Sequence, residues 1–260
     1  MNFSKYNRVF AFGCSFTSYV YPTWANLLFH EAVNAKCYNF GKPGMGNLAI
    51  SSRIAEANTR YNFNEDDLVI VMYTTMFRED RWLHEQWQSY GNVFNQQFYD
   101  QNFVKKYVDP IGCMIRDLSV VELSSTYVRN LPCDSLLLKA SDLKDECDFV
   151  EEDNPTVYRK LIDLYSPMWD NFPKSLKETL FPNGWITRSA KTIENQMIND
   201  SHPITLDYYH YLTSIGVDLS EHTYQYALEA DRKLKLYEDY NEWMNYFPEV
   251  RDRDATSKVF

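Results

Sequence analysis

The sequence predicts an α/β fold in which a parallel sheet, wound right-handed, lies between layers of helices. The first observation is that short apolar segments alternate with helical segments over about the first 75 residues. The second is that glycines follow two of these apolar segments, where a strand would end. The third is that 260 residues, 45% of them hydrophobic, suit one elaborated domain with its own core.

The strands and helices of the first part of the chain follow from this alternation. The expected strands are Arg8–Phe12 and residues 36–40 and 68–72, and the last of these has the clearest pattern of a buried strand. The expected helices run over residues 22–34 and from Asn47, the predicted N-cap, through Ile50, Ile54 and Ala57. Because the carboxyl ends of parallel strands meet at one edge, we expect Ser15, Gly44, Thr74 and Thr75 on that edge.

The pattern loosens beyond this point, and we expect residues 77–184 to form a large aromatic-rich insertion or cap on a single domain, 1–260. Later segments are predicted as helices at 111–130, 155–164 and 205–212, a fourth strand at 133–139 and an acidic solvated loop at 142–153. A fifth strand is expected around 184–188, and one long amphipathic C-terminal helix over 221–247.

Composition excludes several classes of function. Twenty-six basic against thirty-six acidic residues give a net charge of −10, which argues against nucleic acid or an anionic membrane as a partner. The five cysteines are scattered without a CxxC pair, so we expect a reduced cytoplasmic setting rather than a zinc site. The longest uncharged stretch, residues 9–30, is too polar for a spanning helix, and we predict neither a membrane span nor a signal peptide.

Two distant segments carry residues suited to nucleophilic chemistry. Ser15 follows the first strand, where its N–H would lie near a helix N-terminus. Asp200 and His202 precede the helix expected at 205–212, and a carboxylate so placed can fix the imidazole tautomer. A serine needs such a base to attack an ester at neutral pH. Taken singly, these residues have simpler structural interpretations, such as helix capping for Ser15 and a position at a helix start for His202.

Together these segments resemble the SGNH (GDSL-type) hydrolase superfamily. Gly13-Cys14-Ser15 matches the first block of the family, with Cys14 in place of the usual aspartate and interpreted as a small buried residue. Gly44 matches the glycine of the second block, and His202 with Asp200 matches the C-terminal block. The resemblance implies a flavodoxin-like three-layer α/β/α sandwich, the SGNH hydrolase fold. It covers residues 8–75 and 199–212.

The family also implies an oxyanion hole, and here the sequence departs from the pattern. The N–H groups of Ser15 and Gly44 match two of the expected donors. The third block usually supplies an asparagine, but residues 72–78 contain none, so the hydroxyl of Thr74 or Thr75 is expected to stand in. Loss of one oxyanion donor typically costs about 10²–10³ in rate.

The function implied by the resemblance is a serine esterase. His202, oriented by Asp200, would activate Ser15 to attack an acyl ester, such as an acetyl ester, of a carbohydrate or small molecule. An acyltransferase using the same pair remains an alternative, and so does a catalytically silent binding protein, which the missing asparagine favours.

Two further residues are candidates for binding substrate, and nothing indicates a cofactor. Arg78 and Asn47 lie next to the predicted site, although a surface salt bridge and a helix cap are simpler roles for them. The other histidines lack the spacing of metal ligands, and no organic cofactor is implied. We expect a small-molecule or carbohydrate ester as the partner, and neither nucleic acid nor a membrane.

Overall fold

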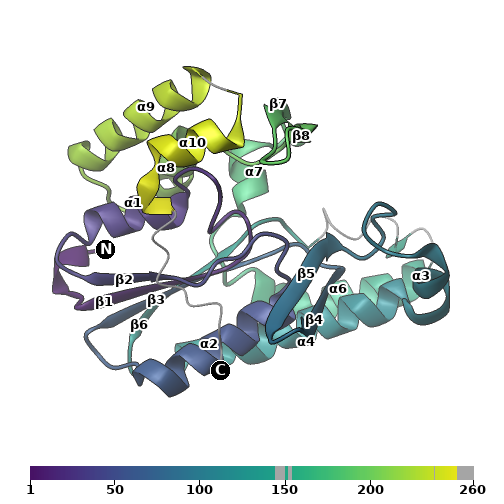
Figure 1. Ribbon diagram of the computed structural model, residues 1–260. Coiled ribbons are helices and arrows are strands. Elements are labelled where there is room, and N and C mark those ends of the chain that lie inside the picture. Colours follow the sequence, from purple (N-terminus) through teal and green to yellow (C-terminus); the bar gives the residue numbers. More distant parts are fainter. Residues whose placement is uncertain (144–149, 152–153, 237, 251–260) are drawn as a thin grey trace.

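A four-stranded parallel sheet forms the centre of the computed structural model (Figure 1). The structure describes residues 1–143, 150–151, 154–236 and 238–250. In the strand order β2-β1-β3-β6, the strands are β1 (Arg8–Phe12), β2 (Lys36–Asn39), β3 (Asp67–Tyr73) and β6 (Asp134–Lys139). The four predicted strands are therefore confirmed, with small differences at their ends.

The central strand β3 is buried along its whole length because helices cover both faces of the sheet. Its one charged residue, Asp67, is directly opposite Arg8 of β1 in the register. The Arg8 guanidinium donates to both Asp67 carboxylate oxygens, at 2.7 and 2.6 Å. This paired contact compensates the burial of the carboxylate at the amino-terminal edge of the sheet.

Two layers of helices enclose the sheet and confirm the predicted three-layer sandwich (Figure 1). On one side lie α1 (Trp24–Glu31), α8 (Thr205–Ser214) and α9 (Glu221–Leu236). On the other lie α2 (Asn47–Tyr61), α4 (Pro110–Arg129) and α6 (Pro155–Trp169). Within the described part of the chain, no helix has the length and apolar character needed to cross a membrane.

Smaller elements border the carboxyl edge of the sheet. They are the hairpin β4 (Arg78–Leu83) with β5 (Gln86–Asn92), the hairpin β7 (Arg188–Lys191) with β8 (Met197–Asp200), and the short helices α3 (Gln101–Tyr107), α7 (Leu176–Leu180) and α10 (Tyr240–Tyr246). Single turns of 3₁₀ helix, η1 (Phe3–Lys5) and η3 (Pro248–Val250), lie near the ends of the described chain.

The expectation of a fifth strand around residues 184–188 is wrong. The strand begins at Arg188, and it pairs antiparallel with β8 rather than joining the central sheet. Most residues of this hairpin are exposed or half-buried, so it has no apolar face to place within a sandwich.

The range 77–184, expected to be an insertion, supplies part of the sandwich itself. Strand β6 pairs with β3 over six register positions from Leu68↔Asp134 to Tyr73↔Lys139, and α4 packs against α2. Most of the acidic loop expected at 142–153 lies outside the described residues.

The long helix expected over 221–247 is divided into α9 and α10. Asp239 is the N-cap of α10, and its side chain accepts hydrogen bonds from the N–H groups of Asn241 and Glu242. A backbone hydrogen bond from Lys191 to Glu238 ties this region to the β7–β8 hairpin. Capping and this tertiary contact therefore override the continuous apolar pattern.

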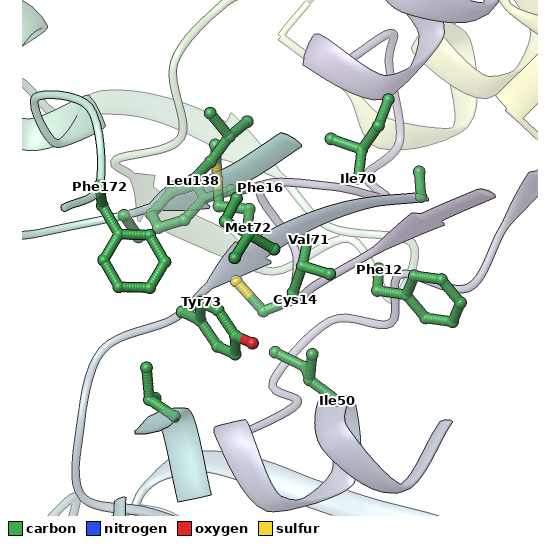
Figure 2. Packing of buried hydrophobic residues seen from close by; sticks show 14 of the residues in the cluster. Phe12, Cys14, Phe16, Ile50, Ile70, Val71, Met72, Tyr73, Leu138 and Phe172 are labelled. Carbon is green, nitrogen blue, oxygen red and sulfur yellow. The ribbon is translucent and has the colours of Figure 1, made fainter. Parts of the chain in front are cut away.

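The main core surrounds the central sheet and includes the end of β3 nearest the predicted site. Figure 2 shows Cys14 among the side chains of Val71, Met72 and Tyr73, with Phe12 and Ile50 nearby. Cys14 is completely buried, as expected for a small apolar residue beside Ser15. Cys14, Cys37, Cys113 and Cys133 are free thiols, and Cys147 lies outside the described residues.

Candidate functional site

The loops after β1 and β2 pack closely at the carboxyl edge of the sheet, and two glycines permit this. A Cβ at Gly13 would overlap the Thr17 hydroxyl, and a Cβ at Gly41 would lie 2.8 Å from the Cβ atoms of Thr17 and Ser18. Asn39 joins the same loops, since its side-chain amide donates to the Thr17 carbonyl at 3.0 Å. The predicted nucleophile therefore stands in a segment held firmly against the neighbouring loop.

Ser15 lies in a turn rather than at the start of a helix, because α1 begins only at Trp24. The N–H groups of Thr17 and Ser18 both donate to the Cys14 carbonyl, which closes the turn around Ser15. The Ser15 side chain is largely buried, with the residue 8% exposed. Among the described residues, no hydrogen bond uses the Ser15 N–H, so this donor is free for an incoming group.

The buried Asp200 and the half-buried His202 form a pair at the end of the β7–β8 hairpin. The imidazole Nδ1 lies 2.7 Å from Asp200 Oδ1, and the same oxygen accepts the His202 backbone N–H at 2.9 Å. Burial opposes ionisation of Asp200, but the hydrogen bonds and charges of His202 and Arg188 outweigh it and lower its pKa. An ionised Asp200 accepts the Nδ1 proton, which leaves Nε2 as the basic nitrogen of a neutral ring.

Arg188 completes this arrangement on the other side of Asp200. Its guanidinium lies 3.1 Å from Asp200 Oδ2 and also donates a short hydrogen bond to the Tyr21 hydroxyl. It lies over the rings of Tyr21 and Trp243, at 5.1 and 5.8 Å from their centroids. The carboxylate is thus fixed by an imidazole on one oxygen and a guanidinium on the other.

The His202 ring lies against the segment that carries Ser15, although the two chain regions are distant in sequence. It stacks on Tyr19 with 3.8 Å between ring centroids and contacts Phe16, the neighbour of Ser15, at 5.3 Å. No hydrogen bond joins the Ser15 hydroxyl to His202 within the described part of the chain. Such contacts are commonly long in enzymes without substrate and shorten when substrate binds.

Gly44 lies beneath the β4–β5 hairpin. Its φ of +80° favours glycine, and a Cβ there would overlap the carbonyl oxygen of Ser89 in β5. The hairpin also supplies Asp80, whose carboxylate accepts the N–H groups of Gly46 and Ala49 at 2.8 and 2.9 Å. Over the residues that the structure describes, the Gly44 N–H, like that of Ser15, makes no hydrogen bond.

The prediction that Asn47 is the N-cap of α2 is wrong. The N-cap of α2 is Gly46, because Asp80 provides the capping carboxylate from another element. The Asn47 side chain instead accepts the Thr74 N–H at 2.9 Å and donates to the Thr74 carbonyl at 3.2 Å. The Asn47 amide therefore holds the loop after β3.

The two threonines proposed as oxyanion donors differ in what they already bind. The Thr74 hydroxyl donates to Cys14 Sγ at 3.2 Å, so both its hydroxyl and its N–H are in use. The Thr75 hydroxyl accepts from Arg78 Nε at 3.0 Å, and its own proton is left to be donated elsewhere. Arg78 Nη1 also donates to the Met45 carbonyl at 3.2 Å, which gives Arg78 internal partners beside its predicted role in binding substrate.

Sequence reasoning missed Arg188, Tyr19 and Tyr21 as members of this site. No local motif marks Arg188, and its partner Tyr21 is 167 positions away. The one available signal was the aromatic alternation of Tyr19 and Tyr21 directly after the Ser15 segment. Among the described residues, no cluster of three or more His, Cys, Asp or Glu side chains could hold a metal ion.

Comparisons with known proteins find likeness at the level of structure. No family model and no curated protein sequence matches the chain. A member of the lipolytic protein G-D-S-L family from Veillonella parvula is 16% identical, with a TM-score of 0.39, covering 87% of this chain and 99% of its own. The acetylxylan esterase Axe2 from Geobacillus stearothermophilus is 13% identical, with a TM-score of 0.41, covering 85% of this chain and 100% of its own.

Proposed function

We propose that this protein is a serine esterase that uses Ser15 as nucleophile and His202 as general base. The observation that carries the proposal is the pair formed by the buried Asp200 and the half-buried His202, 2.7 Å apart, with the imidazole against the segment that contains Ser15. With Nδ1 bound to Asp200, the basic Nε2 is the nitrogen available to a hydroxyl.

The reaction has two steps. His202 Nε2 takes the Ser15 proton as Oγ attacks the ester carbonyl, and the resulting imidazolium then protonates the leaving alcohol as the C–O bond breaks. Water next attacks the acyl-serine in the same way. His202 takes a proton from that water and returns one to Ser15, so the products are a carboxylic acid and an alcohol.

Three donors support the oxyanion in this proposal. The unpaired N–H groups of Ser15 and Gly44 are two of them, and the Thr75 hydroxyl is the third. Thr75 is preferred to Thr74, because both Thr74 donors already bind Asn47 and Cys14. Arg78 acts through Thr75 by occupying a lone pair of its oxygen and directing the hydroxyl proton away from the guanidinium.

Arg188 acts through Asp200 as a positioning residue. If Asp200 became protonated, it could no longer accept the hydrogen bond from His202 Nδ1–H, and the imidazole could rotate or change tautomer. The guanidinium at 3.1 Å favours the ionised carboxylate and fixes its plane. The rings of Tyr21 and Trp243 hold the guanidinium in turn.

Labelling with a fluorophosphonate probe tests this proposal, because the probe reacts covalently with an activated serine. We expect the full chain to be labelled and to hydrolyse p-nitrophenyl acetate. Ser15→Ala should lose the labelling and about 10⁴-fold or more in kcat. Ser119→Ala is the control variant. It removes a hydroxyl of α4 that is hydrogen bonded to Tyr165 of α6, and it should keep both the labelling and the hydrolysis. A folded protein that neither labels nor hydrolyses would favour the silent binding protein.

A further inference from the structure

An apolar groove lies beside the proposed catalytic residues. Its volume is about 490 Å³, within the range of about 300–1,000 Å³ for small-molecule sites. Its walls come from the Ser15 segment, the loop before Gly44, the turn of the β7–β8 hairpin and the α10 region. The lining residues are Tyr19, Val20, Pro43, Thr192, Ile193, Glu194, Tyr240, Met244 and Val250.

The groove adjoins the site at two points. Tyr19 lines the groove and stacks on the His202 imidazole at 3.8 Å, so its ring is a wall common to both. Pro43 lines it as well, directly before Gly44, whose N–H is a proposed oxyanion donor. A substituent on a carbonyl carbon bound at Gly44 would therefore lie close to the part of the groove wall that Pro43 forms.

The polar atoms of the lining are largely committed to partners within the protein. The hydroxyls of Tyr19 and Tyr240 are hydrogen bonded to each other. The Thr192 hydroxyl accepts the Gln196 N–H at 3.2 Å, and the Thr192 backbone N–H donates to the Gln196 carbonyl. This leaves ring faces and aliphatic side chains toward the groove, together with the carboxylate of Glu194. Such a surface favours an uncharged hydrocarbon over a sugar or an anionic group.

We propose that this groove binds the acyl chain of the ester substrate, and that the chain is an uncharged alkyl group longer than acetyl. The inference rests on the proposed esterase function. Each methylene that leaves water for the groove should raise kcat/KM about fourfold until the groove is filled. Met244 is half-buried, has a flexible side chain and lies in the wall formed by α10. A larger side chain at this position would occupy the groove.

A chain-length series of p-nitrophenyl esters from acetate to octanoate tests the inference. We expect the full chain to favour the longer esters, and Met244→Trp to lose this preference. Ile186→Trp, at a residue that is 71% exposed and outside the lining, is the matched control and should keep the preference. An active enzyme with the same kcat/KM for every acyl length overturns the inference and leaves the esterase proposal standing. In a second series, of acetate esters with alcohols of increasing length, a preference that follows the length of the alcohol instead also overturns it.

Binding distinguishes the remaining case, in which no ester is hydrolysed and the esterase proposal fails. The apolar dye Nile red is bound to the Ser15→Ala protein and displaced with octanamide. Displacement that Met244→Trp abolishes and Ile186→Trp preserves supports an alkyl-binding groove independently of catalysis. Absence of displacement overturns the groove as well.

Discussion

The ionisation of one buried carboxylate, Asp200, controls the proposed chemistry at the scale of single residues. Because its pKa is lowered in the folded protein, Asp200 contributes stability above its unfolded pKa and loses that contribution as pH falls through the folded pKa. The same protonation removes the acceptor for His202 Nδ1. Acid should therefore weaken the fold and the catalytic base together.

Replacing Arg188 tests the part of this effect that comes from the guanidinium. Arg188→Met removes a cation from Asp200 Oδ2, so the Asp200 pKa should rise and the acid limb of the kcat/KM profile should move to higher pH. Arg188→Lys keeps the charge and should restore most of the wild-type profile. An unchanged limb in a folded, active Arg188→Met protein would mean that Arg188 serves packing alone.

The two threonines at the end of β3 give a second prediction at this scale. Thr75→Val removes the hydroxyl left free to donate, and kcat should fall about 10²–10³-fold with little change in KM. Thr75→Ser should recover activity. Thr74→Val, which removes a hydroxyl already bound to Cys14, should cost much less. Equal losses at both positions would contradict the assignment of the third donor to Thr75.

At the scale of elements, the β4–β5 hairpin restricts which residue the neighbouring loop can carry at position 44. Gly44 and Gly91 have similar φ angles, +80° and +83°, but only Gly44 has the Ser89 carbonyl in the path of a Cβ. Gly91→Ala should therefore cost about 1–2 kcal/mol, the penalty of a left-handed conformation alone. Gly44→Ala should cost more and reduce kcat, since the hairpin or the loop must move. Urea unfolding and p-nitrophenyl acetate hydrolysis measure the two effects.

The same elements show what sequence patterns can and cannot predict. Strand β3 is recognisable because burial on both faces requires a continuous apolar run. The β4–β5 hairpin is polar and half-exposed, and its position depends on tertiary contacts such as Asp80 with the start of α2. Ser15, Gly44 and His202 could be proposed from local motifs. Arg188 could not, because its role exists only once Tyr21 and Asp200 are brought together.

On the scale of the whole molecule, the buried apolar residues of the described part of the chain form two separate clusters, and the smaller one supports the proposed base. The large cluster surrounds the central sheet. The smaller, which we term the C-terminal cluster, comprises Tyr19, Tyr21, Ala190, Ala230, Leu234, Tyr240, Trp243, Phe247 and Val250. Tyr19 of this cluster stacks on His202 and Trp243 lies against Arg188, so the proposed base depends in part on packing outside the main core.

This division predicts that the site can be lost before the fold. Trp243 is 1% exposed and packs at 5.4 Å from the rings of both Tyr21 and Tyr240, so Trp243→Ala should destabilise the C-terminal cluster by about 3–5 kcal/mol. Esterase activity should then disappear on heating well below the temperature at which far-ultraviolet circular dichroism reports loss of the sheet and helices. Trp169→Ala, an equivalent truncation in the main cluster, should instead lower both temperatures together. If activity and circular dichroism are lost together in Trp243→Ala as well, the two clusters unfold as one unit, and the catalytic base is as stable as the sheet.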